Sequence, residues 1–328
     1  MPGKPMSKVP VSFLKCRLIE ENYFLIASKP DGLDESTEFT RLFFYDDLEP
    51  VSKWNRWDLP GFGLADICIV RESIPGARCY AALSKEGAVS YSGAGKQWTE
   101  KVGESGVKTR DATPVFGYLN ALKEIAGDLY ACGGGGQIYR RHDGRWRDIA
   151  GDLRRGTPDF SKPVPSNQVE LPEDFSGIDG YSSDDVYVTG MNGIYHFNGT
   201  AWKKCLAPTD EMLTAIMCTE GGLVWACGFN GTVLRGNARN GFEDVSHYED
   251  NMILTSIEMS DGGILFSSND GVYKLPMGAH GQKLPKVQSM QDCEHASSLG
   301  KTMIAVGAKK VMVNHNGSWT ELVHPDNS

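Results

Sequence analysis

Apolar and polar residues alternate along this chain in short runs that are separated by glycine-containing turns. The run Asp185–Gly190 sets Val186 and Val188 against Tyr187 and Thr189, which is the two-residue period of a β-strand. The pairs Asn192-Gly193 and Asn198-Gly199 follow, and Asn-Gly is a strong signal for a hairpin turn. This stretch therefore predicts a meander of about three strands, the last of which carries Trp202.

The same meander recurs along the whole chain. Seven copies can be aligned, at residues 23–57, 79–98, 128–146, 185–202, 222–242, 263–273 and 302–319. Runs at 175–181, 213–218 and 254–259 supply a further strand ahead of three of them. Several strands repeated at periods of about 40–50 residues are typical of β-propeller blades. The sequence therefore predicts an all-β protein, a single β-propeller of seven four-stranded blades over residues 11–328, after a flexible N-terminus at residues 1–10.

Recurring cysteines and tryptophans are predicted to be structural. Cys132 and Cys227 occupy the same position in corresponding strands, where cysteine behaves as a small buried apolar residue. The eight cysteines include no CxxC pair, so we expect reduced thiols, no disulfide framework and no zinc site. Trp146, Trp202 and Trp319 each follow a glycine turn, and we expect them to pack between the edges of neighbouring blades.

Length and composition agree with one folded, turn-rich domain. The 328 residues include 38 glycines, and 40% of the chain is hydrophobic. The first ten residues hold no apolar core of a signal peptide, and no run approaches the roughly 20 apolar residues of a membrane helix. We therefore expect a cytoplasmic protein without a membrane partner, the alternative being export by a route that the sequence does not indicate.

The formal net charge of −9 opposes nucleic-acid binding, which requires a basic face. A local basic run around Arg140, Arg141, Arg145 and Arg147 is predicted to form a solvated edge. Negative charge gathers in the least regular copy of the repeat. There we predict a site for a basic protein partner, made of Asp31, Asp34, Glu35, Glu38, Asp46 and Asp47 with Trp54 and Trp57 as anchors, because aromatic anchors within a charged rim are the usual makeup of a binding hot spot. The alternative is that these carboxylates serve only solubility.

No motif for catalysis, metal binding or cofactor binding stands out. Gly133–Gly136 lies between two predicted strands, whereas a phosphate-binding loop leads into a helix. The seven histidines show no ligand spacing, and Cys293-Glu294-His295 lacks a third partner. The repeat is interrupted at 100–114, 151–172 and 276–292, where loops could carry function.

The sequence Asp185-Val-Tyr-Val-Thr-Gly, continued by Gly193-Ile-Tyr and Asn198-Gly-Thr-Ala-Trp202, resembles the bacterial propeller repeat of the YVTN and WD-repeat-like superfamily. It is also similar to repeats of photosystem II assembly-factor-like propellers and of Asp-box proteins. These motifs specify blades and no activity. Arg141 and Asn314 stand where an Asp-box has its aspartate, which argues against a sialidase.

Compact, acidic bacterial propellers without catalytic motifs resemble immunity proteins that block a toxin, often a basic nuclease. The sequence therefore predicts a non-enzymatic, protein-binding propeller, and specifically an immunity protein that neutralises a toxin. Two alternatives are open. A glycan-active hydrolase or lyase would need two facing carboxylates at roughly 5–9.5 Å. An assembly factor for a larger complex has only the similarity of fold in its favour.

Overall fold

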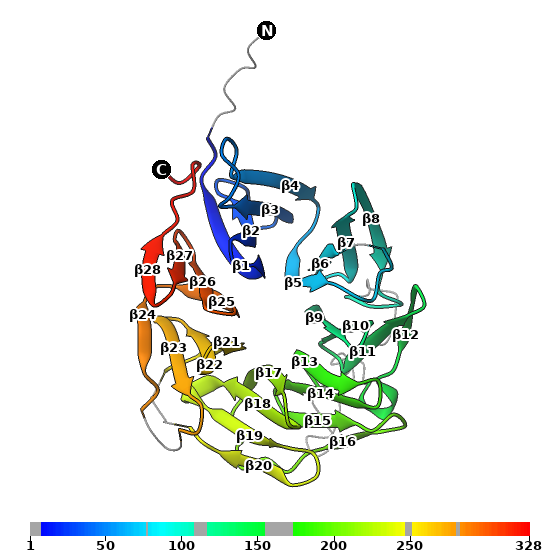
Figure 1. Cartoon of the computed structure of the whole chain (residues 1–328). Coiled ribbons are helices and arrows are strands. Elements are labelled where there is room, and N and C mark those ends of the chain that lie inside the picture. Colours follow the sequence, from blue (N-terminus) through cyan, green and yellow to red (C-terminus); the bar gives the residue numbers. More distant parts are fainter. Residues whose placement is uncertain (1–7, 77, 108–116, 155–172, 247–250, 280–282) are drawn as a thin grey trace. The chain divides into compact units, whose positions relative to one another are not determined.

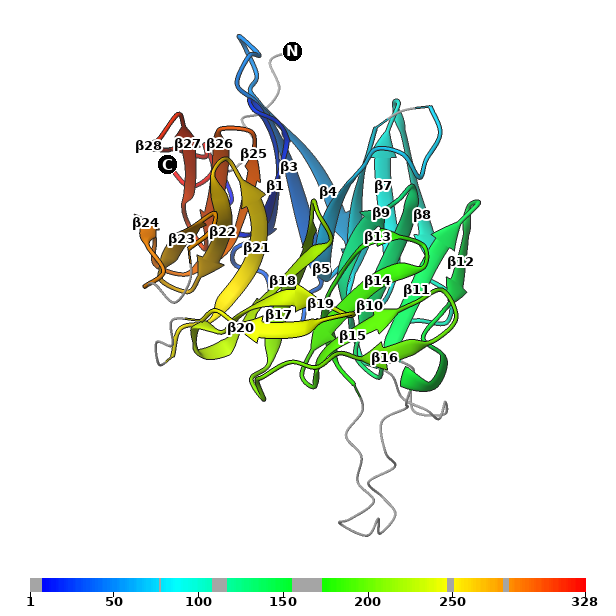
Figure 2. The same cartoon turned by 60° about the horizontal axis from the view of Figure 1, so that its bottom comes forward.

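Seven antiparallel sheets make up the fold (Figure 1 and Figure 2). The computed structural model describes residues 8–76, 78–107, 117–154, 173–246, 251–279 and 283–328. Each sheet consists of four strands that follow one another in the chain, and no α-helix occurs in the described ranges. The predicted all-β class and the seven four-stranded blades are thereby confirmed.

The chain divides into two compact units, and the boundary falls inside strand β21. The first unit comprises Met1–Gly63, Glu258–Ala279 and Leu284–Ser328. Its strands, with β21 given whole, are β1 Val11–Glu20, β2 Tyr23–Pro30, β3 Phe39–Asp46, β4 Trp54–Pro60, β21 Leu254–Ser260, β22 Gly263–Ser268, β23 Gly271–Pro276, β24 Lys286–Ser289, β25 Cys293–Leu299, β26 Thr302–Gly307, β27 Val311–His315 and β28 Ser318–Glu321.

The second unit comprises Leu64–Ile257 and His280–Lys283. Its strands are β5 Leu64–Val70, β6 Cys79–Ser84, β7 Ala88–Gly93, β8 Lys96–Lys101, β9 Leu119–Ile125, β10 Asp128–Gly133, β11 Gln137–His142, β12 Arg145–Asp148, β13 Phe175–Ser182, β14 Asp185–Gly190, β15 Gly193–Phe197, β16 Trp202–Lys204, β17 Leu213–Thr219, β18 Leu223–Gly228, β19 Val233–Asn237 and β20 Gly241–Asp244. Short 3-10 turns lie between strands of the described residues at η1 Gly151–Leu153 and η3 Phe229–Gly231.

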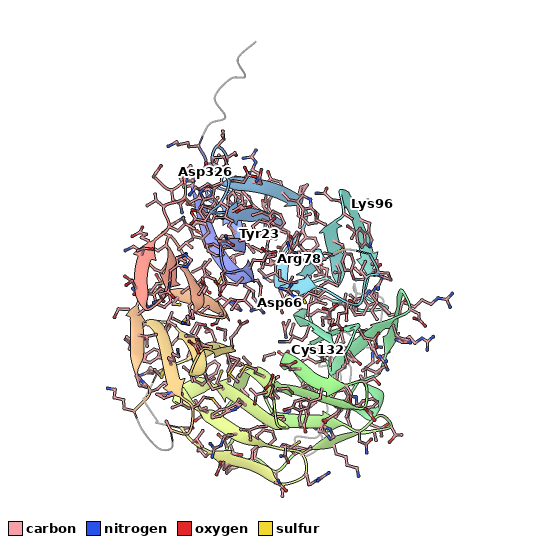
Figure 3. All side chains as sticks on the ribbon, in the orientation of Figure 1. Tyr23, Asp66, Arg78, Lys96, Cys132 and Asp326 are labelled. Atoms are coloured by element: carbon pink, nitrogen blue, oxygen red, sulfur yellow. The ribbon has the colours of Figure 1, made fainter. Side chains whose placement is uncertain are left out.

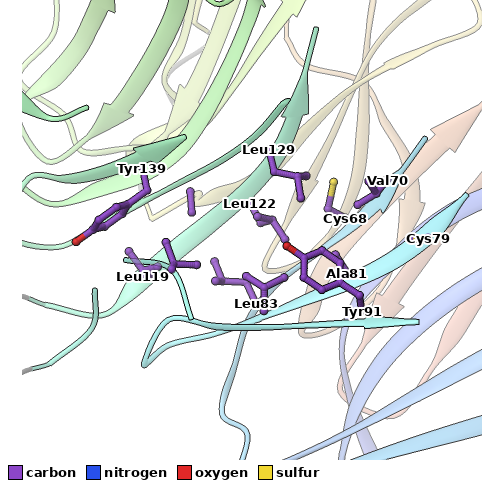
Figure 4. Packing of buried hydrophobic residues seen from close by; sticks show 13 residues of the cluster. Cys68, Val70, Cys79, Ala81, Leu83, Tyr91, Leu119, Leu122, Leu129 and Tyr139 are labelled. Carbon is purple, nitrogen blue, oxygen red and sulfur yellow. The ribbon is translucent and has the colours of Figure 1, made fainter. Parts of the chain in front are cut away.

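Apolar cores lie between successive sheets. One core joins the sheet β5–β8 to the sheet β9–β12 and includes Leu83, Tyr91, Leu122, Leu129 and Tyr139 (Figure 4). The second strand of each sheet is covered on both faces, so β10 and β26 are buried throughout and their sequences are almost continuously apolar. The fourth strands are more exposed and more polar, as in β12 and β28.

Carboxylates on first strands also connect neighbouring sheets. Asp66 of β5, labelled in Figure 3, accepts a hydrogen bond from the Leu122 amide of β9 at 2.9 Å. Asp179 of β13 accepts one from the Cys218 amide of β17 at 3.0 Å. In the first unit, Glu258 of β21 accepts one from the Ser298 amide of β25 at 3.0 Å. Each amide lies on the first strand of its sheet, where no further strand can accept its hydrogen bond. The carboxylate from the neighbouring sheet accepts it instead.

The beginning of β1 is held by residues from the far end of the chain. The Val11 amide donates to Asn327 Oδ1 at 2.8 Å, and Asn327 Nδ2 donates to the Val11 carbonyl at 3.1 Å. The Phe13 amide donates to the Ala308 carbonyl at 2.9 Å. The first and last sheets of the chain are therefore joined within the first unit.

The predicted structural roles of tryptophan and cysteine are confirmed. Trp146, Trp202 and Trp319 are half-buried, and each packs against a core between two sheets. The Trp202 indole donates to the Ile149 carbonyl of the preceding sheet's connection at 2.7 Å. All eight cysteines are free thiols.

Candidate protein-binding surfaces

The first sheet has longer loops than several other sheets at both of its ends. Its β3–β4 connection spans residues 47–53, whereas the corresponding turns β7–β8, β11–β12 and β27–β28 span 94–95, 143–144 and 316–317. Its β2–β3 connection spans 31–38, whereas the β14–β15 and β22–β23 turns span 191–192 and 269–270. The regular repeat does not require these extra residues, so both loops are candidates for function.

The structure separates the six predicted carboxylates into two groups. Asp46 is paired with Tyr23, which is labelled in Figure 3, at one end of the sheet. Asp31, Asp34, Glu35 and Glu38 belong to the loop at the opposite end, beyond Pro30. The length of β3 separates the groups by about 25 Å, at ~3.4 Å per residue. They are therefore two acidic surfaces and not one patch.

Part of the charge at the 31–38 end is engaged within the protein. Asp31 forms an ion pair with Lys309 and accepts a hydrogen bond from Ser12 Oγ at 2.8 Å. Asp34 accepts hydrogen bonds from the Ser36 hydroxyl and amide at 2.7 and 3.0 Å, which hold its pKa below the ordinary value. Glu35 and Glu38 are exposed. Asp34 is exposed as well, so three carboxylates of this loop face solvent.

The other end carries a tight hairpin tip. Asp47 accepts hydrogen bonds from Lys53 Nζ at 2.7 Å and from the Tyr45 hydroxyl at 2.8 Å, and both lower its pKa. Asp46 Oδ1 accepts a hydrogen bond from the Leu48 amide at 3.0 Å. These contacts fix the two ends of the 47–53 loop, and the side chains between them point into solvent.

Trp54 helps to build this sheet. Its ring lies 4.8 Å from the ring of Tyr45, 4.4 Å from that of His324 and 5.8 Å from that of Phe43. Trp57 is half-buried and faces Leu42 in the register of the sheet. A role of either tryptophan in binding stays a prediction, and for Trp54 only the exposed part of the ring is available.

Two clefts in the second unit were not predicted. The larger, of about 730 Å³, is lined by Asp184, Asp185, His196 and Arg239, and His196 Nε2 lies 2.9 Å from Asp185 Oδ1. The smaller, of about 570 Å³, contains a second such pair, in which His142 Nδ1 lies 2.8 Å from Asp128 Oδ1.

Ser182 of β13 borders both clefts, so they are neighbours. Each histidine meets an aspartate at the start of the preceding strand, a pairing that single-residue inspection of the sequence overlooks. Their linings mix acidic and basic side chains, so neither cleft has the single sign of charge expected for a strongly charged partner.

The predicted solvated arginine edge is wrong for Arg141. Arg141 is 9% exposed, and its guanidinium donates to both oxygens of Glu100, at 2.7 and 2.8 Å. The indoles of Trp146 and Trp98 donate to the same carboxylate at 3.2 and 3.4 Å. Arg145 and Arg147 are exposed as predicted. Glu100 therefore connects the sheet β5–β8 to the sheet β9–β12.

Metal-binding geometry is absent from the described part of the chain, where no three His, Cys, Asp or Glu side chains gather closely enough to hold an ion. His295, from the sequence cluster at 293–295, is buried beside Arg17, and burial lowers its pKa well below the ordinary value. A membrane-spanning helix is likewise not found among the described residues. His247 and His280, and residues 108–114, 155–172 and 280–282 of the predicted loop regions, lie outside the described residues.

Solved structures share this architecture. A catalytically inactive virginiamycin B lyase from Staphylococcus aureus with quinupristin matches with a TM-score of 0.68, 12% identity and coverage of 94% of this chain and 96% of that one. The WD40 β-propeller domain of Doa1 matches with a TM-score of 0.65, 10% identity and coverage of 97% and 95%. The chain is a seven-bladed β-propeller. YCF48 bound to D1 peptide has a TM-score of 0.57 to this propeller, 12% identity and coverage of 99% and 97%.

One curated protein is similar to this propeller in sequence. It is the immune protein Tsi7 of Pseudomonas aeruginosa, which is 32% identical over 215 residues. The match covers 65% of this chain and 66% of Tsi7, so it spans just under two thirds of the relative's length. No protein-family model matches the chain.

Proposed function

We propose that this propeller is an immunity protein that binds a toxin protein and neutralises it without catalysis. The observation that carries the proposal is the 32% identity to the immune protein Tsi7 over 215 residues. The fold alone does not decide the function, since the structurally similar proteins include a lyase and a propeller solved with a bound peptide. Within this proposal the protein is bacterial and acts in the cytoplasm.

The partner is proposed to be basic, with a nuclease as the specific expectation. The net charge of −9 favours electrostatic attraction of a positively charged protein and repels nucleic acid. A nuclease needs a basic surface to hold phosphates, so an acidic inhibitor complements it. The two acidic ends of the first sheet are the proposed sources of this attraction.

If the proposal is correct, a gene next to the one for this chain should encode the toxin, and co-expression with that toxin tests the function. Growth should be rescued by this chain, and the purified toxin should lose activity in a titration that ends at a fixed molar ratio. If a small, substoichiometric amount of this protein inactivated all of the toxin, the protein would instead be an enzyme that acts on the toxin. A toxin that stays fully active and unbound in the presence of excess protein would contradict the proposed function.

Charge steering is tested by association kinetics with the same toxin. One variant changes Asp31, Asp34, Glu35 and Glu38 to the corresponding amides, and a second changes Asp46 and Asp47 to Asn. The association rate should fall for the end that faces the toxin, and the difference should shrink as salt is added, because screening acts over ~8 Å at physiological ionic strength. An association rate that neither variant changes at low salt would remove the first sheet from the encounter.

A further inference from the structure

We infer that the β3–β4 hairpin tip, residues 46–53, is the segment that enters the toxin, with Leu48 and Val51 filling an apolar pocket that has a basic rim. This inference rests on the proposed function and names the contact surface for it. The tip is exposed, held at its base and negatively charged.

The tip exposes aliphatic surface that the fold does not use. Leu48 is 75% exposed and Val51 is 92% exposed, and Pro50 between them is exposed as well. Isolated exposed aliphatic residues are ordinary on protein surfaces, but here three lie within four residues of one loop, and we call this group the apolar knob. The corresponding turns at 94–95, 143–144 and 316–317 are too short to present such a knob.

The knob stands on a rigid base. The Asp46 amide donates to the Lys53 carbonyl, and the Asp47 amide donates to the Asn22 carbonyl of the β1–β2 turn, both at 2.9 Å. The ion pair between Asp47 and Lys53 closes the loop, and the Tyr45 hydroxyl supports it from below. The Tyr45 ring in turn stacks on Phe24 at 5.6 Å and contacts Trp54. A preformed loop loses little conformational entropy on binding, which favours affinity.

The charges around the knob select a basic partner. Asp46, Asp47 and Glu49 bring three negative charges to residues 46–53, and Lys53 brings one positive charge, so the tip carries a net charge of −2. An apolar centre inside a charged rim is the arrangement of a binding hot spot. It complements a concave surface with aliphatic or aromatic walls and Lys or Arg at the edge. The tip therefore fits a protein pocket of that kind.

The test uses the purified toxin encoded by the neighbouring gene and a double variant, Leu48→Ser with Val51→Ser. Since both side chains face solvent, the variant should keep the melting temperature of the wild type. Its affinity should fall by about 30-fold or more, mainly through faster dissociation. The matched control is Leu206→Ser, because Leu206 is equally apolar and 83% exposed but belongs to the second unit. Its affinity should stay within about twofold of wild type.

The outcomes separate the two proposals. If the wild-type protein neither binds nor inhibits the toxin, the proposed function fails and the inference fails with it. If the wild type binds and the double variant binds within about threefold, only the hairpin inference is overturned. The same holds if Leu206→Ser weakens binding as much as the double variant does, since the loss is then not specific to the tip.

Discussion

At the scale of single residues, Glu100 joins two sheets through several hydrogen bonds, which its position in the sequence does not indicate. Its carboxylate accepts hydrogen bonds from the Arg141 guanidinium and from two indole NH groups. Arg141 itself is buried. Burial raises the pKa of the Glu100 carboxyl, but the hydrogen bond and charge of Arg141, together with Trp98 and Trp146, outweigh burial and leave the pKa below its usual 4.5. The charged form of Glu100 therefore stabilises the folded state.

Glu100→Gln should lower the free energy of unfolding by about 3 kcal/mol at pH 7, because it leaves a buried guanidinium without its counter-charge. Because the folded pKa of Glu100 is below the unfolded one, its contribution is complete well above pH 4.5 and is lost as the pH falls through the folded pKa. Denaturant unfolding at pH 7 and pH 3 should show wild type and variant converging in acid. A difference independent of pH would assign the effect to packing alone.

Trp202 is a second residue whose effect can be measured. Trp202→Ala removes an indole that packs against the core between two sheets and the hydrogen bond to the Ile149 carbonyl. The free energy of unfolding should fall by about 3 kcal/mol, at the lower end of the range for large aromatic residues because Trp202 is only half-buried. Trp202→Phe loses mainly the hydrogen bond and should cost about 1 kcal/mol. Equal losses for both variants, in denaturant titrations, would contradict this division.

At the scale of strands and sheets, the links between neighbouring first strands are polar. Asp66 is 5% exposed and satisfies the Leu122 amide of the next sheet. Asp66→Ala should cost about 2–3 kcal/mol of stability, since a buried amide loses its acceptor. Thermal unfolding measures the effect, and hydrogen exchange at Leu122 should speed up more than exchange at Leu129 in β10. Unchanged exchange at Leu122 would show that another group accepts from this amide.

Most strands could be predicted from turn chemistry, because Asn-Gly and Asp-Gly pairs mark where each hairpin reverses. The sequence predicts the second and third strands of all seven sheets. It predicts the first strands β13, β17 and β21 but not β1, β5, β9 and β25, in which Lys15, Asp66, Lys123 and Glu294 stand among the apolar residues. Asp66 contacts a neighbouring sheet, and periodicity along one strand cannot show such a contact.

The candidate site was predicted less well for a related reason. Asp31–Glu38 and Asp46–Asp47 are close in sequence, but the strand β3 between them carries the chain to the other end of the sheet. The histidine–aspartate pairs in the two clefts join different strands, so their geometry depends on the register. The sequence indicates which sheet is irregular. The pairing of its strands is needed to show which carboxylates lie at the same end of that sheet.

At the scale of the whole molecule, the eight free thiols give a simple test of packing. Six are buried and two, Cys205 and Cys218, are half-buried. Burial raises the pKa of Cys205 to about 11 and that of Cys227 and Cys293 to about 12, so few thiolates exist at pH 8. A thiol reagent at pH 8 should label at most the two half-buried cysteines of the native protein and all eight in denaturant. Fewer than eight in denaturant without reductant would reveal a disulfide.

The contacts of Val11 and Phe13 can form only late in synthesis, because their partners lie far along the chain. The amides of Val11 and Phe13 find their acceptors on Asn327 and Ala308, which are synthesised much later than the first strand. At ~5–20 residues per second, the first strand waits roughly 15–60 s for these partners. During that interval an extended apolar strand has unsatisfied donors at its beginning, and it can pair with other chains. A nascent chain cut short before residue 308 would therefore lose the closing contacts of its first sheet, although all four strands of that sheet had already been synthesised.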